Sequence, residues 1–180
     1  MNMKCQKLFI FVEGEDDRIF FEKIIKPKLE NLYQYIIEPI LYAEKKGEKI
    51  SNFIKSINAM KAEYIFFADI NSALCIKRKK EDLKNTYREI DEDKIVVVVK
   101  SIEGWYLAGL KNSDLAQLKI KLPDKETTDN ITKRQFNELI PKRFNSRFDY
   151  LIEISKRFSI ETAITKNSSF SYFIKKYFSK

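Results

Sequence analysis

Short apolar segments alternate with helix-like segments over the first 110 residues of the chain. Residues 7–12 predict a first strand, and residues 16–32 predict a helix that begins with Asp16 as its N-cap. Residues 35–42 predict a second strand. Because proline has no backbone N–H to donate, Pro39 places this strand at the edge of a sheet. The chain therefore opens with a strand, a helix and a second strand.

The same alternation continues through two further strands. Residues 49–61 and 72–88 predict helices, and the apolar residues 64–68 between them predict a third strand. The unbroken β-branched run at residues 95–99 is typical of a strand that is buried on both faces of a parallel sheet. These elements predict a three-layer α/β domain over residues 1–112, with a parallel, Rossmann-like sheet and right-handed crossovers.

The pattern changes after this domain, and residues 113–180 predict a helical C-terminal extension packed on it. The segment at residues 122–130 is polar and predicts a solvated loop. Three helices are expected, over residues 133–140, 146–158 and 169–178. Residues 159–167 give no clear pattern.

Charge and composition limit the kinds of chemistry available. The chain has 34 basic and 26 acidic residues, a net charge of +8, which fits either a polyanionic partner or an ordinary lysine-rich protein. It has no histidine, which excludes His-based acid–base catalysis, Ser-His-Asp triads and most catalytic zinc sites. Cys5 and Cys75 form no metal-binding or disulfide pattern. Without a leader or a membrane-spanning apolar run, a cytoplasmic protein with no membrane partner is expected.

Acidic or amide side chains follow three of the predicted strands. Glu13, Asp16 and Asp17 follow the first, Asp69 and Asn71 the third, and Glu103 the fourth. The carboxyl ends of parallel strands meet at one edge of a sheet, where open α/β sheets bind their ligands. Carboxylates this close repel one another unless a divalent cation neutralises them, and oxygen ligands suit Mg²⁺ or Mn²⁺. Capping of the following helices is the structural alternative for each acid.

The residues around these acids resemble a known family. Phe-Val-Glu13-Gly-x-x-Asp17 is similar to the first motif of the TOPRIM domain, which topoisomerases, primases and OLD-type nucleases share. Asp69-x-Asn71 after an apolar strand resembles the second motif, with asparagine in place of its second aspartate. Residues 101–107 resemble the Ser-x-Glu-x-Trp segment of small, stand-alone TOPRIM-like proteins related to the nuclease half of OLD proteins. Residues 168–173 resemble their closing helix.

The resemblance implies a TOPRIM-like fold and a divalent-metal-dependent nuclease that hydrolyses phosphodiester bonds in DNA or RNA. Glu13 would be the general base, with Asp69 and Lys100 completing the catalytic residues. Lys100 would contact the scissile phosphate, or alternatively pair with a nearby carboxylate. The expected ligands of Mg²⁺ or Mn²⁺ are Glu13, Asp17, Asp69, Asn71 and Glu103. Since Asn71 brings no charge, a weakened metal site is also expected.

Basic residues indicate a nucleic-acid partner. The candidates are Lys77, Arg78, Lys100, Arg143, Arg147 and Lys166. Interleaved aromatic residues fit a phosphate-following groove or a solvated helix face with buried aromatics. DNA and RNA remain equally open, as does the oligomeric state. The chain has no Walker A motif, so an ATPase of the kind that works beside OLD-type nucleases in defence or repair would be a separate chain.

Two other functions fit part of the pattern. A non-catalytic TOPRIM-like module could hold nucleic acid or a protein partner through the weakened Asp69-x-Asn71 motif. A phosphoacceptor receiver domain has a similar arrangement of acids followed by Lys100. The receiver is the weaker alternative, because it needs a further strand between the acceptor aspartate and the lysine and leaves Glu13 and the helical tail unexplained.

Overall fold

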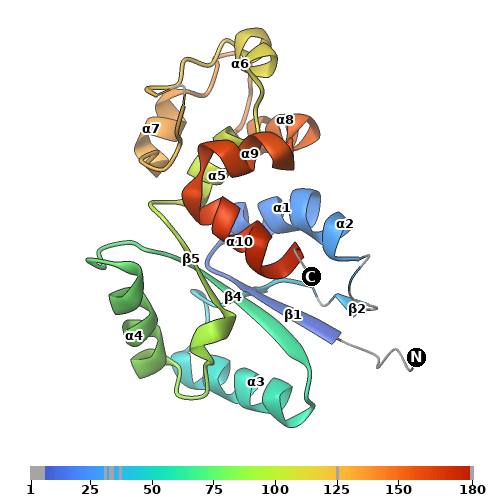
Figure 1. Ribbon diagram of the computed structural model, residues 1–180, viewed down its shortest axis with the longest axis vertical. Coiled ribbons are helices and arrows are strands. Elements are labelled where there is room, and N and C mark those ends of the chain that lie inside the picture. The colour runs from blue at the N-terminus through green and yellow to red at the C-terminus, as the bar shows by residue number, and fades with distance from the viewer. Residues whose placement is uncertain (1–6, 31, 33–34, 37, 125, 179–180) are drawn as a thin grey trace. The chain divides into compact units, whose positions relative to one another are not determined.

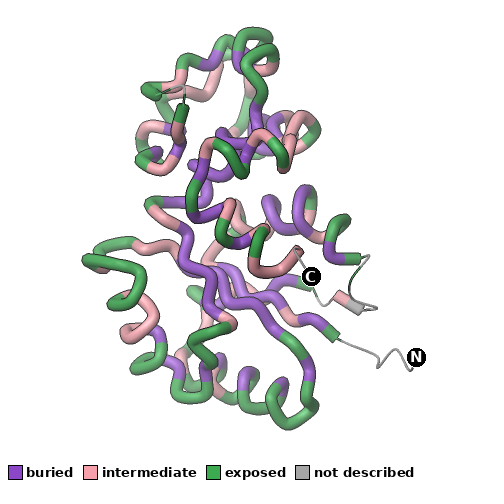
Figure 2. The backbone as a smooth tube through the Cα atoms, in the orientation of Figure 1, coloured by how far each residue is buried: buried purple, intermediate pink, exposed green. Residues whose placement is uncertain are grey.

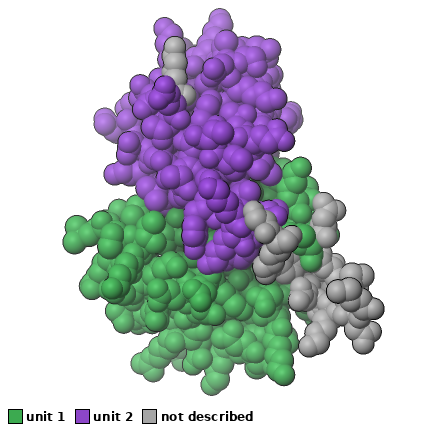
Figure 3. All heavy atoms as spheres, viewed as in Figure 1, with its two compact units in different colours: residues 1–97 green, residues 98–180 purple. Residues whose placement is uncertain are grey.

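The computed structural model describes residues 7–30, 32, 35–36, 38–124 and 126–178 (Figure 1). Cys5 lies outside the described residues. The chain divides into two compact units, Met1–Val97 and Val98–Lys180 (Figure 3). This division falls earlier than the boundary after residue 112 that the sequence predicts. The reason is that helix α5 (Ile102–Ala108) packs against helices of the second unit.

A parallel sheet forms the centre of the first unit. Its strands are β1 (Lys7–Val12), β2 (Tyr35–Ile36), β3 (Ile40–Leu41), β4 (Glu63–Asp69) and β5 (Ile95–Val98). The order across the sheet is β2-β1-β4-β5, with β3 also paired to β1. All the pairings are parallel. The predicted α/β class with a parallel, Rossmann-like sheet is therefore confirmed.

The second predicted strand is present as two short pieces on one edge of β1. β2 pairs with the beginning of β1, through Lys7 and Leu8, while β3 pairs with its end, through Phe11 and Val12. Phe11 is paired to β3 on one side and to β4 on the other, so β3 lies on the edge of β1 opposite β4. Pro39 lies between the two pieces. Its missing N–H cannot extend the hydrogen-bonded ladder.

The helix expected over residues 16–32 is present as three consecutive segments. These are α1 (Glu15–Phe20), the π-helical η1 (Phe21–Ile25) and α2 (Lys26–Leu29). The predicted N-cap at Asp16 is wrong, because the helix begins at Glu15 and its N-cap is Gly14, two residues before Asp16. Asp17 makes the capping contact instead, since its carboxylate accepts a hydrogen bond from the Gly14 N–H at 3.1 Å.

Helices cover both faces of the sheet. α3 (Gly47–Ala59) and α1 lie on opposite sides of it in Figure 1. α3 presents Ile50, Ile54 and Ile57 to the sheet at helical spacing, and these pack with Phe66 and its neighbours in one apolar cluster. α4 (Ile76–Thr86) adds to the same cluster through Leu83, after which the short 3₁₀ turn η2 (Glu92–Lys94) leads into β5. The buried strands are visible as purple tube in Figure 2.

The second unit is helical in its described residues apart from Val98 and the connecting loops. Its helices are α5, α6 (Asn112–Leu118), α7 (Lys133–Glu138), α8 (Arg147–Arg157), α9 (Ile160–Lys166) and α10 (Ser168–Phe178). The three helices predicted for the C-terminal part are confirmed as α7, α8 and α10, and α9 fills the segment without a clear pattern. In the described part of the chain, no helix combines the length and the apolar character needed to cross a membrane.

Candidate functional site

The carboxylate of Glu13 lies where the ends of three strands meet. Its Oε2 accepts hydrogen bonds from the Tyr42 hydroxyl at 3.4 Å and the Asp69 backbone N–H at 3.3 Å. Its Oε1 accepts from the Asn71 amide Nδ2 at 3.4 Å. These residues follow or end β1, β3 and β4, which are neighbours in the sheet. The structure thus brings together three residues that the sequence predicts for one site, namely Glu13, Asp69 and Asn71.

Tyr42 is a member of this cluster that the sequence does not predict. Its side chain is buried, and its backbone N–H donates to the carbonyl of Val12 at 3.0 Å, which holds it beside Glu13. Burial raises the pKa of the Tyr42 phenol, and the negative charges of Glu13, Asp17 and Asp69 raise this pKa further. The phenol therefore stays protonated and donates its hydrogen bond to Glu13. In the sequence, only the position of Tyr42 at the end of a predicted strand indicates that it could lie beside the site.

The cluster carries a concentrated negative charge. The carboxylates of Glu13, Asp17 and Asp69 all act on the one Tyr42 hydroxyl. A hydroxyl, a backbone N–H and an amide N–H stabilise the Glu13 carboxylate, and no ion pair to it is found among the described residues. Such a group of acids attracts a cation more strongly than a dispersed set of surface acids does.

Gly14 adopts an extended backbone next to this cluster. Its φ is −146°, so the position does not require the left-handed conformation expected of a tight turn. A Cβ placed there would have the Asp17 Oδ2 at 3.7 Å as its nearest neighbour, which is an ordinary contact. The position therefore places no conformational demand that only glycine could meet.

The described residues contain no group of three or more Asp, Glu or Cys side chains close enough together to hold a metal ion. This does not prevent Mg²⁺ binding, because Mg²⁺ keeps several waters and commonly takes only one or two carboxylates together with substrate phosphates. Glu13 supplies one such carboxylate. Asn71 can turn its amide oxygen toward a cation, since the two ends of an amide are related by a simple flip. The donor set fits a weakly held Mg²⁺ better than a rigid cage.

Lys100 occupies a rare backbone conformation in the second unit. Its φ is +64°, which lies in the left-handed region that lysine seldom adopts. The Ser101 N–H donates to the Val99 carbonyl at 3.0 Å, so Lys100 is the central residue of a three-residue γ-turn. Its side chain is exposed. The turn joins β5 to α5.

Glu103 and Arg147 are partners of each other within the second unit. The Glu103 carboxylate is buried, with 2% of the residue exposed, and its Oε1 accepts from Arg147 Nη2 at 2.6 Å. The guanidinium of Arg147 also bonds the Asn137 amide oxygen and lies over the Phe136 ring, 4.8 Å from its centre. Thus the predicted metal ligand Glu103 is buried and paired, and the predicted nucleic-acid contact Arg147 is its partly exposed partner.

The two C-terminal motifs noted in the sequence are joined by buried hydrogen bonds. The Trp105 indole N–H donates to the Ser169 hydroxyl at 2.8 Å, and this hydroxyl donates to the Asn167 amide oxygen at 2.9 Å. The Asn167 amide nitrogen in turn donates to the Thr128 hydroxyl at 3.2 Å. Trp105 is fully buried against Phe170. Its burial anchors α5 in this unit and leaves no exposed face for stacking on a base.

Asn167→Ala is expected to lower the free energy of unfolding by about 2–3 kcal/mol. The substitution leaves the hydroxyl of Ser169 and the backbone N–H of Phe170 without their buried acceptor. Urea denaturation followed by circular dichroism measures the change. Asn52→Ala, on the exposed side of α3, is the matched control and should change the value by less than about 0.5 kcal/mol. Equal stability of the two variants would contradict a structural role for this network.

The basic residues of α4 lie on the surface of the first unit. Lys77 and Arg78 are both exposed. Arg78 forms ion pairs with Glu81 at 3.7 Å and Asp82 at 3.2 Å, so part of its charge is neutralised by its own helix. Lys77 remains one of the more accessible candidates for contact with a phosphate.

The remaining basic candidates belong to the second unit. The Arg143 guanidinium lies over the Phe144 ring, 5.1 Å from its centre. Lys166 is partly buried, and its ammonium group donates to the Leu110 carbonyl at 2.8 Å. Burial lowers the pKa of Lys166. These contacts give each residue a local structural partner.

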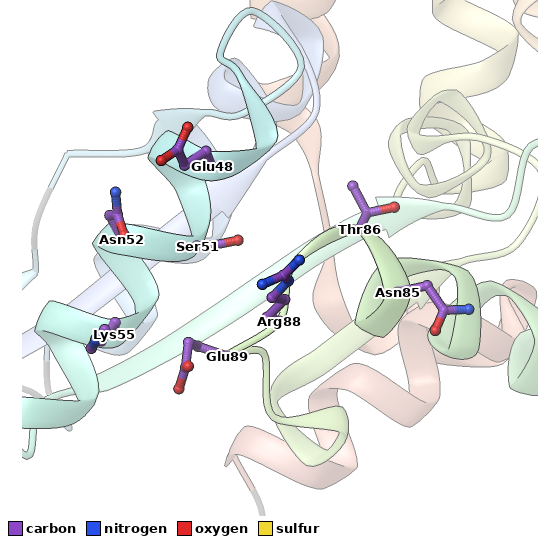
Figure 4. A pocket seen from close by; sticks show the side chains of 8 residues that line it. All are labelled: Glu48, Ser51, Asn52, Lys55, Asn85, Thr86, Arg88 and Glu89. Carbon is purple, nitrogen blue, oxygen red and sulfur yellow. The ribbon is translucent and has the colours of Figure 1, made fainter.

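A polar cleft of about 570 Å³ lies between α3 and the end of α4 in the first unit (Figure 4). Its lining residues are Glu48, Ser51, Asn52, Lys55, Asn85, Thr86, Arg88 and Glu89. Two acids and two bases balance one another there, so the charges favour no single class of ligand. None of the predicted site residues lines this cleft.

Comparisons with known proteins give no relative of this chain. No protein-family model, no curated protein and no solved structure matches it. The TOPRIM resemblance therefore stays a prediction from the motifs.

Proposed function

We propose that this protein is a divalent-metal-dependent phosphodiesterase that cleaves nucleic acid, with Glu13 at the centre of its active site. The observation that carries the proposal is the position of the Glu13 carboxylate at the shared carboxyl edge of β1 and β4, where Asp69 and Asn71 hold it. Ligands of parallel α/β sheets bind at this edge. The surrounding acids and the basic net charge of +8 support a polyanionic substrate bound through a cation.

The residues of the cluster have separate roles in this proposal. Glu13 takes the proton of the attacking water, since the chain has no histidine to do so. Tyr42 orients the Glu13 carboxylate through its protonated hydroxyl. Asp69, Asn71 and Asp17 provide oxygen atoms for Mg²⁺ or Mn²⁺. The cation, when bound, polarises the scissile phosphate and lowers the pKa of bound water. Neither Lys100 nor Glu103 is needed for these roles.

The test incubates metal-stripped protein with supercoiled plasmid, labelled single-stranded DNA and labelled RNA. Cleavage is expected after Mg²⁺ or Mn²⁺ is added and should stop with EDTA. Asp69→Asn should abolish this cleavage, because it removes a charge from the cluster. Glu63→Gln, at the other end of β4 and exposed, is the matched control and should cleave like the natural protein. Equal cleavage by Asp69→Asn would show a contaminating nuclease and contradict the proposal.

A second candidate is a nucleic-acid-binding module that does not cleave. Asn71 favours it, because its φ of +48° lies in the left-handed region where asparagine is common, while its side chain adds no charge for a cation. The lack of a three-acid group among the described residues favours it as well. Nucleic-acid binding that Mg²⁺ strengthens, with no cleavage of any of the three substrates, would establish this candidate.

The receiver-domain alternative loses support. β4 is followed by α4, the turn η2 and β5, so residues 70–94, all of them described, contain no strand. A receiver needs one between its acceptor aspartate and its lysine.

A further inference from the structure

An apolar tip projects from the loop that joins β4 to α4. Leu74 is 96% exposed and Ile76 is 46% exposed, with the exposed Cys75 between them. In Figure 2 this loop reaches away from the sheet and is largely green. Isolated apolar side chains are common on protein surfaces, but two of them close together, at the end of a projecting loop and the start of the helix after it, indicate a contact surface.

The helix that follows this tip adds an unusual positive charge. The first turn of α4 has no acidic residue, although acids are favoured there by the helix dipole. It has Lys77, Arg78 and Lys79 instead, with Lys80 directly after them. The N-cap residue Cys75 makes no side-chain hydrogen bond to the helix. Positive side chains thus add to the positive end of the helix beside the apolar tip, which favours a polyanionic partner.

The other end of the same loop belongs to the candidate active site. Asp69 ends β4, and both Asp69 and Asn71 bond the Glu13 carboxylate. A turn closed by the Ala73 N–H and the Ile70 carbonyl, at 3.0 Å, then leads to Leu74. Leu74 is five residue steps beyond Asp69, so their Cα atoms are at most about 17 Å apart. This distance equals about five nucleotides along one strand of a duplex.

We propose that the β4–α4 loop is a docking element for nucleic acid, in which Leu74 and Ile76 press against unpaired or easily unstacked bases. Lys77 and Lys79 contact the flanking phosphates, and the bound strand extends toward Asp69 and Glu13. Apolar side chains that wedge between bases beside basic residues are a general mode of nucleic-acid binding. This inference rests on the proposed function, because it places a substrate strand within reach of the proposed active site.

A nucleic acid fits this surface better than an anionic membrane does. Membrane-surface binding generally uses the whole apolar face of an amphipathic helix. Here the apolar part is two side chains, one on the loop and one at the first residue of α4, and the exposed face of α4 carries Glu81 and Asp82 among its basic residues. A strand of nucleic acid can contact the tip and the first turn of the helix without meeting those acids.

The test measures the fluorescence anisotropy of a labelled 20-nucleotide single strand and its duplex, in EDTA so that no cleavage occurs. The double variant Leu74→Ser/Ile76→Ser is expected to bind about tenfold more weakly, with an unchanged salt dependence. Lys77→Gln should instead reduce the slope of log K against log salt by about 0.7 for the single strand. Met60→Ser and Lys49→Gln, both exposed, are the matched controls. Melting temperatures should stay unchanged, because the substituted side chains are exposed.

Two outcomes would overturn this inference. One is equal affinity of the double variant and the natural protein for both oligonucleotides. The other is unchanged nucleic-acid binding together with lost binding to phosphatidylserine vesicles, which would assign the tip to a membrane. The proposed function can fail separately. Binding in EDTA that depends on Leu74, without any cleavage in Mg²⁺, would support the docking element and contradict only the nuclease activity.

Discussion

Glu13→Gln is expected to lower metal-dependent phosphodiester cleavage at least about a thousandfold while leaving the fold intact. Glutamine has the same size as glutamate, and its amide oxygen can still accept from the Tyr42 hydroxyl and the Asp69 N–H. It cannot take a proton from water, and it brings no charge to a cation. The position facing Asn71 Nδ2 becomes an amide nitrogen, so Asn71 must flip its amide to keep a hydrogen bond there.

Initial rates of plasmid and oligonucleotide cleavage in Mg²⁺ measure this effect, and thermal melting reports on the fold. Glu44→Gln is the matched control, because this exposed acid lies outside the cluster and its loss should leave the rate unchanged. A Glu13→Gln rate within about fivefold of the natural protein would remove Glu13 from the role of general base. A rate lost together with a large fall in melting temperature would point to misfolding, and Tyr42→Phe would then separate support of the carboxylate from folding.

The strands of the sheet could be predicted because each is a short apolar run that polar residues bound. β1, β4 and β5 lie where the pattern places them. The edge strand was predicted as one piece because its interruption depends on how Pro39 meets the ladder of β1. The capping contact of α1 could not be predicted, because Asp16 and Asp17 are equally suitable in sequence. Only the backbone geometry, with Gly14 as the N-cap, brings the Asp17 carboxylate to the Gly14 N–H.

The core of the candidate site could be predicted for a topological reason. Glu13 and Asp69 are 56 residues apart in sequence, but parallel neighbouring strands bring their carboxyl ends to one edge. The contact of Tyr42 with Glu13 could not be predicted, because it requires β3 to lie beside β1. Likewise, the pairing of Glu103 with Arg147 depends on how α5 and α8 pack, for which the sequence gives no register.

Arg147→Met is expected to lower the free energy of unfolding by about 3–5 kcal/mol, because it leaves the buried Glu103 carboxylate without its compensating charge. The double variant Glu103→Gln/Arg147→Met should lose less stability than Arg147→Met alone, since it removes the uncompensated charge. Urea denaturation of the natural protein, both single variants and the double variant gives the coupling energy. Arg134→Met is the matched control, because its pair with Glu138 is exposed and contributes at most about 1 kcal/mol.

The same variants distinguish a structural ion pair from the roles that the sequence predicts. If Arg147 chiefly contacts nucleic acid, Arg147→Met should leave the stability within about 0.5 kcal/mol of the natural protein and weaken binding. If Glu103 chiefly binds a metal, Glu103→Gln should weaken the Mg²⁺ dependence of cleavage with little change in stability. The burial of Glu103 and its 2.6 Å contact with Arg147 favour a structural ion pair instead. We therefore expect Arg147→Met to lower stability and the double variant to restore part of it, because a buried carboxylate needs a fixed positive partner whether or not a cation is present.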